Sequence, residues 1–134
     1  MAFIKSKKNN FARAHESLAW ATNMLSRYVD DADMYLPMVA SVIKNFELTY
    51  ETCWKFLRHY LFEKEGIEAN SPRMVFRVCS ERGILPEDLA RELIILIDVR
   101  NETMHTYDQE VAERVVADIL KHSQVFSRVL ELIS

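Results

Sequence analysis

The longest regular feature of the sequence is an apolar repeat that extends from residue 39 to residue 60. It consists of two interleaved series with a spacing of seven residues: Val39, Phe46, Cys53 and Tyr60, then Ile43, Tyr50 and Leu57. Steps of three and four residues place side chains on one face of an α-helix, whereas a half-buried strand would alternate. Because Pro37 precedes the repeat and Gly66 follows it, we expect one long helix with proline in its first turn and glycine at its C-cap.

Other segments carry the same helical periodicity. The first has the stripe Phe11, Ala14, Leu18, Ala21, Leu25 and Tyr28. Ser71-Pro72 predicts the N-cap and first residue of a short helix, with Gly83 at its end. Its predicted apolar residues are Met74, Val75, Val78 and Cys79. Pro86 and two acidic residues predict the start of the next helix, and Asp108 the N-cap of a last helix that extends from Val111 to Ile133.

These patterns predict an all-α fold. The 134 residues include only two Gly and three Pro, which suits long helices joined by short connections. We expect an up-and-down four-helix bundle with the segment 71–82 as an extra short helix. Residues 1–9 are expected to be a mobile basic leader, and residues 10–134 a single domain. No run of 18 apolar residues occurs, so we expect no membrane partner and a cytoplasmic protein.

Charge limits the kind of partner. The formal net charge is −3, so contact with RNA or a nucleotide requires a local basic patch. Lys5, Lys7, Lys8 and Arg13 form one such group, and Arg73 and Arg77 belong to a second. We take Arg73 and Arg77 as candidate nucleotide- or RNA-binding residues, although ordinary solvated charge explains both groups equally. Cys53 and Cys79 lie on apolar helical faces, where a reduced cysteine acts as a small hydrophobe.

The most unusual segment is Asp98–Asp108. The helix before it carries the apolar stripe Leu89, Leu93 and Leu96, and the next position on this stripe is Arg100. A guanidinium on a buried face needs a partner, and His105 can exchange protons near neutral pH. On a straight helix these two side chains lie about 140° apart. They therefore meet only if the helix ends or loosens between residues 103 and 106, or if two subunits share the site.

Arginine and histidine together permit metal-independent cleavage of RNA. Arg100 would stabilise charge on a phosphate, and His105 would transfer protons. Asn101 and Asp98 are candidate supporting residues. The sequence has no HEXXH, CxxC or P-loop motif, and we expect no metal and no cofactor. The alternative is an ion pair of Arg100 with Asp98 or Glu102, with His105 at the helix C-terminus.

Residues 100–108, R-N-E-T-M-H-T-Y-D, resemble the R-N-x-x-x-H-x-Y signature of HEPN domains, the higher-eukaryote and prokaryote nucleotide-binding helical bundles. Residues 53–57, 71–73 and 105–108 are more closely similar to nucleotidyltransferase substrate-binding proteins, the HepT-like partners of minimal nucleotidyltransferases. The resemblance extends from about Phe11 to the C-terminus. It implies a homodimeric helical bundle with a nucleotidyltransferase partner encoded in the same operon.

The resemblance also implies residue roles. In HEPN ribonucleases the motif arginine and histidine line a cleft at the dimer interface, here Arg100 and His105. In HepT-type toxins the tyrosine two residues after the histidine, here Tyr107, accepts AMP from the partner and the toxin is silenced. The predicted function is thus a toxin-like endoribonuclease of a toxin–antitoxin pair. The alternatives are a non-catalytic module that binds a nucleotide or substrate, in which Trp20 and Met24 would also take part, and a purely structural bundle.

Overall fold

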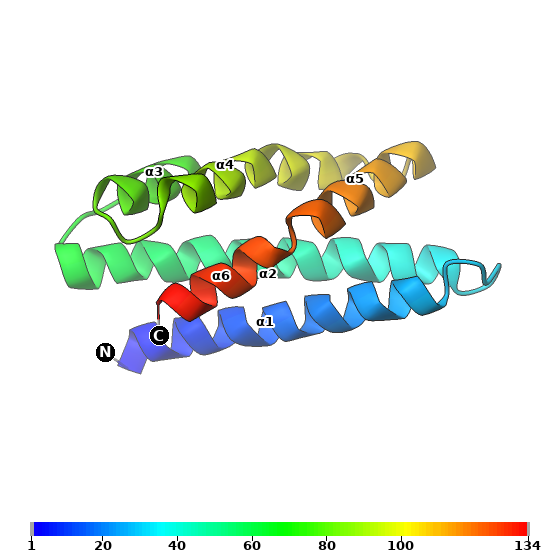
Figure 1. The fold of residues 1–134 in the computed structure, drawn as a ribbon, viewed down its shortest axis with the longest axis horizontal. Helices are drawn as coiled ribbons and strands as arrows, with labels where there is room; N and C mark the ends of the chain where they lie inside the picture. The colour runs from blue at the N-terminus through cyan, green and yellow to red at the C-terminus, as the bar shows by residue number, and fades with distance from the viewer. Residues whose placement is uncertain (1, 134) are drawn as a thin grey trace.

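The computed structural model describes residues 2–133 and is an all-helical bundle, as expected (Figure 1). Met1 and Ser134, and the side chain of Ala2, lie outside the described part. The elements in chain order are α1 (Ala2–Arg27), α2 (Tyr35–Glu65), α3 (Pro72–Glu81), α4 (Glu87–Glu102), the 3-10 helix η1 (Thr103–His105), α5 (Gln109–His122) and α6 (Gln124–Leu132). Within residues 2–133 no helix is both long enough and apolar enough to cross a membrane.

The bundle is built on α1 and α2, which lie side by side and antiparallel along the whole molecule (Figure 1). The apolar repeat of α2 forms the centre of a continuous core: Val39, Ile43, Phe46, Tyr50, Cys53 and Leu57 are all buried. The stripe on α1 meets it through Phe11, Leu18 and Ala21. The predicted core faces of the two longest helices are therefore confirmed.

Local signals correctly predicted three of the helix ends. Gly66 closes α2 in the left-handed conformation, with φ of 67°, where other residues would be strained. The hydroxyl of Ser71 accepts a hydrogen bond from the Met74 N–H at 3.3 Å, and Pro72 is the first residue of α3. Asp108 caps α5 by accepting from the N–H groups of Glu110 and Val111. Each cap satisfies N–H or C=O groups that a helix end leaves unpaired.

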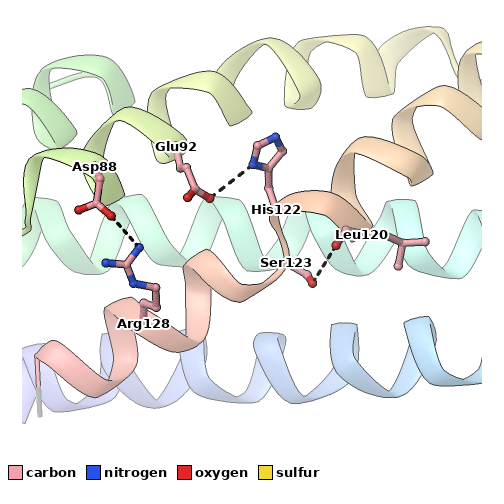
Figure 2. Close-up of polar contacts among 6 residues, drawn as sticks. All are labelled: Asp88, Glu92, Leu120, His122, Ser123 and Arg128. Carbon is pink, nitrogen blue, oxygen red and sulfur yellow. Dashed lines mark hydrogen bonds and ion pairs between the residues drawn. The ribbon is translucent and has the colours of Figure 1, made fainter.

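The last predicted helix is two helices in the structure, and the prediction of one continuous helix was wrong. The chain turns at Ser123, whose hydroxyl donates to the Leu120 carbonyl at 3.3 Å. On either side of the turn, His122 contacts Glu92 at 3.4 Å and Arg128 contacts Asp88 at 3.2 Å (Figure 2). The bend carries α6 from α4 towards α1 (Figure 1), where Phe126 packs against Phe11 and Phe46. A straight helix would leave that part of the core open.

The N-terminal prediction also needs correction. Residues 2–9 were expected to be a mobile leader, but they are the first turns of α1. The physical reason is that this segment has apolar contacts of its own. The Phe3 ring lies edge-on to the His59 ring at 4.7 Å, and Ile4 packs against the core. The expected structural boundary before residue 10 is therefore absent from the described chain.

Of two predictions for α3, the one for its apolar face is partly wrong and the one for its cysteine is confirmed. Met74 was predicted to face the core but is half exposed, whereas Phe76, which the periodicity did not single out, is completely buried. The short helix thus presents Val75, Phe76 and Cys79 to its neighbours. Cys53 and Cys79 are both buried and free, as expected. Burial raises the pKa of the Cys79 thiol to about 12, so it stays protonated and behaves as a hydrophobic side chain.

Candidate functional site

Arg100 interrupts the apolar stripe of α4 as the sequence predicted. Leu89, Leu93 and Leu96 are buried, and Arg100 is the next residue on their face, partly buried near the end of the helix. Among residues 2–133 its guanidinium has no carboxylate within ion-pair distance and no hydrogen-bond acceptor. Glu102 instead pairs with Arg114 at 3.3 Å, and Asp98 is exposed. The local ion pair considered for Arg100 is therefore wrong.

The helix ends close to the segment 103–106, where a loosened helix was one of the two predicted alternatives. α4 stops at Glu102, and residues 103–105 continue as a single 3-10 turn. The Thr103 hydroxyl donates to the Arg100 carbonyl at 2.6 Å, and the Thr106 hydroxyl donates to the Thr103 carbonyl at 3.0 Å. The Thr103 N–H also donates to the Arg100 and Asn101 carbonyls, so backbone and hydroxyl groups together bond to the carbonyls at the end of the helix. The angle of a straight helix thus no longer relates His105 to Arg100.

His105 and Tyr107 project from this turn together. Both are exposed, Tyr107 with 86% of its surface accessible. Their rings meet edge to face with centroids 6.2 Å apart and an angle of 75° between the planes. Immediately afterwards the chain is anchored by the Asp108 cap of α5. An imidazole and a phenol are therefore presented to solvent on a short turn held at both ends by helices.

Arg100 lies in a pocket that does not include His105. The pocket has a volume of about 190 Å³ and is lined by Tyr50, Glu51, Trp54, Pro72, Ile97, Arg100 and Asn101. It joins α2, the start of α3 and the end of α4. Asn101, predicted as a supporting residue, is thus beside Arg100, whereas Asp98 is outside the pocket.

Tyr50 is the residue of this site that the sequence reasoning did not identify. The apolar repeat of α2 marked it as a packing residue, and it is only 2% exposed. Its hydroxyl, however, is buried without a hydrogen-bond partner among the described residues. Burial raises the pKa of Tyr50, and the nearby cations of Arg100 and Arg73 oppose this only in part. The one available signal was a polar hydroxyl on the core face, where phenylalanine would have sufficed.

The remaining predicted site residues, Arg73, Arg77 and Tyr107, lie in different parts of the structure. Arg73 follows Pro72 at the start of α3 and its charge influences Tyr50, but it is exposed and is not among the residues that line the Arg100 pocket. Arg77 is exposed one turn further along α3 and does not line that pocket. Tyr107 borders a different hollow of about 420 Å³ between the first half of α2 and the start of α5, with Thr106, Lys44 and Glu47 in its wall.

The donor groups of the described chain suit phosphate better than a metal. Residues 2–133 contain no cluster of three or more His, Cys, Asp or Glu side chains placed to share a metal ion. The Arg100 pocket is lined by an arginine, an asparagine and a tyrosine, residue types that donate hydrogen bonds to phosphate oxygens, and by one carboxylate, Glu51.

The chain has relatives among known protein families and solved structures. Residues 7–133 match the profile of a protein family described as "Nucleotidyltransferase substrate binding protein like". No functionally curated protein is detectably similar. A crystal structure of a protein from Thermus thermophilus is 32% identical, with a TM-score of 0.72, and the match covers 90% of this chain and 99% of that one.

Two further structures carry functional descriptions. A Haemophilus influenzae protein, described as a substrate-binding domain of a nucleotidyltransferase, is 26% identical with a TM-score of 0.77, over 92% of this chain and 96% of that one. A Shewanella oneidensis protein, described as a tri-AMPylated HEPN toxin in complex with an MNT antitoxin, is 20% identical with a TM-score of 0.73, over 97% and 95%. The second likeness is one of fold.

Proposed function

The chain belongs to the nucleotidyltransferase substrate-binding-protein-like family, with the HEPN fold, and we propose that it is a toxin-like endoribonuclease controlled by a cognate nucleotidyltransferase. The observation that carries the proposal is the unpaired Arg100, held in a pocket one turn before the exposed pair of His105 and Tyr107. A cation that stays charged and has no partner among residues 2–133 is suited to bind a phosphate group of a ligand.

We further propose that the working site is formed by two copies of the chain. Cleavage of a phosphodiester needs a base and an acid, and the segment 98–108 supplies only one histidine. A two-fold axis beside the end of α4 would bring the same residues of both subunits into one cleft. The exposed Met104, next to His105, is the apolar side chain of this segment available for such a contact.

In this cleft one His105 accepts the proton of a ribose 2′-hydroxyl, and the 2′-oxygen attacks the adjacent phosphorus. The bond to the 5′-oxygen breaks, and the His105 of the second subunit protonates that oxygen. The products are a 2′,3′-cyclic phosphate and a 5′-hydroxyl. Arg100 stabilises the charge that develops on the phosphoryl oxygens. No step requires a metal ion.

The test is RNA cleavage by the purified chain and its variants. We expect Arg100→Ala and His105→Ala to reduce cleavage by at least about a hundredfold, as removal of a proton-transfer group or a charge-stabilising donor does. Arg91→Ala, in the exposed part of the same helix, and His15→Ala on α1 are the matched controls and should cleave normally. Cleavage that persists in both site variants, or a strictly monomeric active species in sedimentation, contradicts the proposal.

Tyr107 is the proposed point of control. Its phenol is exposed, and a nucleotidyltransferase that holds a nucleoside triphosphate could use it as the acceptor. The phenolic oxygen attacks the α-phosphorus of ATP, pyrophosphate leaves and the phenolic proton passes to a base of the partner. The transferred AMP would place negative charge and bulk beside His105. We expect co-expression with the partner to add AMP to the Tyr107 peptide and to stop cleavage, and Tyr107→Phe to escape both effects.

One observation favours a second function. The pocket of Arg100 and Asn101 does not include His105, which fits a non-catalytic subunit that presents a nucleotide or substrate to its partner. The description of the Haemophilus influenzae relative is of this kind. Here Arg73 and Arg77 would contribute to nucleotide binding, and Trp20 and Met24 to docking with the partner. Nucleotide binding that survives His105→Ala but is lost in Arg100→Ala, in a chain that cleaves no RNA, supports this function over the nuclease.

A further inference from the structure

The buried hydroxyl of Tyr50 has no partner in the described protein. A buried donor without an acceptor is destabilising, and native proteins rarely retain one. The ring of Tyr50 packs in the core, where its centroid lies 6.0 Å from that of Phe46 and 6.1 Å from that of Phe76. Phenylalanine would make the same ring contacts without the unpaired hydroxyl. Packing therefore explains the ring of Tyr50 and leaves the hydroxyl unexplained.

Tyr50 lies in the wall of the Arg100 pocket, where the other polar groups are mainly donors. Arg100 and Asn101 line the same space, and Arg73 is close by. The one carboxylate in the lining, Glu51, already pairs with Lys55 at 3.2 Å, which reduces its repulsion of an anion. Tyr50, whose hydroxyl is unpaired, is thus one of the residues that line a small cavity in which Arg100 has no ion-pair partner among the described residues.

The size of the cavity limits its occupant. A volume of about 190 Å³ equals roughly six water molecules at about 30 Å³ each. That space accommodates a phosphate group and its ester oxygens but not a whole nucleotide. A base or a second sugar would have to extend beyond the pocket.

We propose that Tyr50 is a positioning residue whose hydroxyl donates a hydrogen bond to a phosphate group bound by Arg100 in this pocket. The proposal rests on the phosphate-binding role of Arg100 in the proposed function and adds to it a residue of α2, fifty positions away in the sequence. The phosphate can belong to an RNA strand or to a mononucleotide, because the recognising groups are the same. A neutral phenol donates to a phosphate oxygen without adding charge.

Trp54, which also lines the pocket, provides a direct readout. In a Trp20→Phe background it is the only tryptophan, because the sequence contains two. We would titrate this protein with inorganic phosphate, with AMP and with adenosine at constant ionic strength, and follow the Trp54 emission. Phosphate and AMP should produce a saturable change and adenosine should not. Tyr50→Phe should weaken the binding of phosphate and of AMP roughly ten- to a hundredfold, which is the range expected for loss of a hydrogen bond to a charged group.

Tyr60→Phe is the matched control, since Tyr60 is a partly buried tyrosine of the same helix that lies outside this pocket. It should bind phosphate normally. A purely structural role for the Tyr50 hydroxyl predicts a lower thermal midpoint in Tyr50→Phe, whereas we expect the midpoint to be equal or higher because a costly unpaired group is removed. A lower midpoint, unchanged phosphate affinity, equal binding of adenosine and AMP, or no saturable change with phosphate or AMP would each overturn the proposal.

The same variants separate this proposal from the proposed function. If the chain cleaves RNA and Tyr50→Phe cleaves equally well with an unchanged KM, the role of Tyr50 is rejected and the nuclease stands. If the chain cleaves no RNA but binds phosphate in a manner that depends on Tyr50, the nuclease is rejected and the pocket stands.

Discussion

Replacement of Arg100 by leucine should make the protein more stable while it removes function. Position 100 continues the buried stripe of Leu89, Leu93 and Leu96, and its guanidinium has no partner among the described residues. Complete burial of a leucine side chain stabilises by about 1.5–3 kcal/mol. The position is only partly buried, and the methylene stem of arginine already covers part of the same surface. We therefore expect a net gain of about 0.5–1 kcal/mol from Arg100→Leu.

This gain is measurable as a thermal shift. Unfolding entropies average about 2.1 cal/mol/K per residue, so for 134 residues the midpoint should rise by about 2–4 °C. Thermal unfolding followed by circular dichroism, at one fixed protein concentration because dimerisation would shift the midpoint, gives the value. Arg91→Leu is the control: this exposed arginine pairs with Glu87 at 2.9 Å, and a surface pair contributes about 0–1 kcal/mol.

Two results would refute the reasoning. A loss of more than about 1 kcal/mol in Arg100→Leu would mean that Arg100 is held by protein groups and serves the fold. Retention of RNA cleavage and of phosphate binding would mean that the unpaired guanidinium has no ligand. Stability gained together with function lost is the pattern expected of a residue kept for its chemistry.

Three further predictions concern the core and the helix cap that support the site. Phe126→Ala should destabilise by about 3–5 kcal/mol in urea unfolding, because this buried ring of α6 fills the centre of the core; a loss below about 1 kcal/mol would mean that α6 is not firmly packed. Asp108→Ala should lower the free energy of unfolding by about 0.5–2 kcal/mol through loss of the α5 cap, whereas Asp108→Asn should keep most of the stability that the cap provides. Equal losses in the two variants would show that the cap hydrogen bond does not stabilise the protein. Burial raises the pKa of Cys79 to about 12 and raises that of Cys53, whereas the unfolded thiols ionise near 9.0. Stability should therefore be intact below about pH 9 and decline as the pH rises towards 12, and the urea midpoint of a Cys53→Ala, Cys79→Ala variant should fall less between about pH 8 and pH 10.

Much of the candidate site could be predicted because it depends on residues near one another in the chain. Arg100 was identified as a candidate site residue by its place on an apolar stripe, and its position in the lining of a pocket agrees with that prediction. A helix end that loosens between residues 103 and 106 was one of the two alternatives for His105, and the 3-10 turn of residues 103–105 agrees with it. Whether Arg100 and His105 act together in a two-fold cleft stays a prediction, because it concerns a second copy of the chain.

The errors have a common physical origin. Residues 111–133 have one unbroken helical period, and the break at Ser123 is favoured by what α6 gains against α1 and α4, which periodicity does not describe. Residues 2–9 lack a strong apolar stripe, yet Phe3 finds His59 on the neighbouring helix. Met74 and Phe76 are two positions apart on α3, and only the placement of α2 and α4 decides which of them is buried.

The sequence by itself determined the helical class, the caps at Gly66, Ser71 and Asp108, and the chemical types gathered between residues 98 and 108. These features follow from side-chain spacing and from hydrogen bonds that close within a few residues. Only the tertiary structure decided that Tyr50 of α2 shares a pocket with Arg100 of α4, and that Arg100 has no acidic partner among the described residues. Such contacts join segments fifty residues apart, and they depend on how whole helices pack against each other.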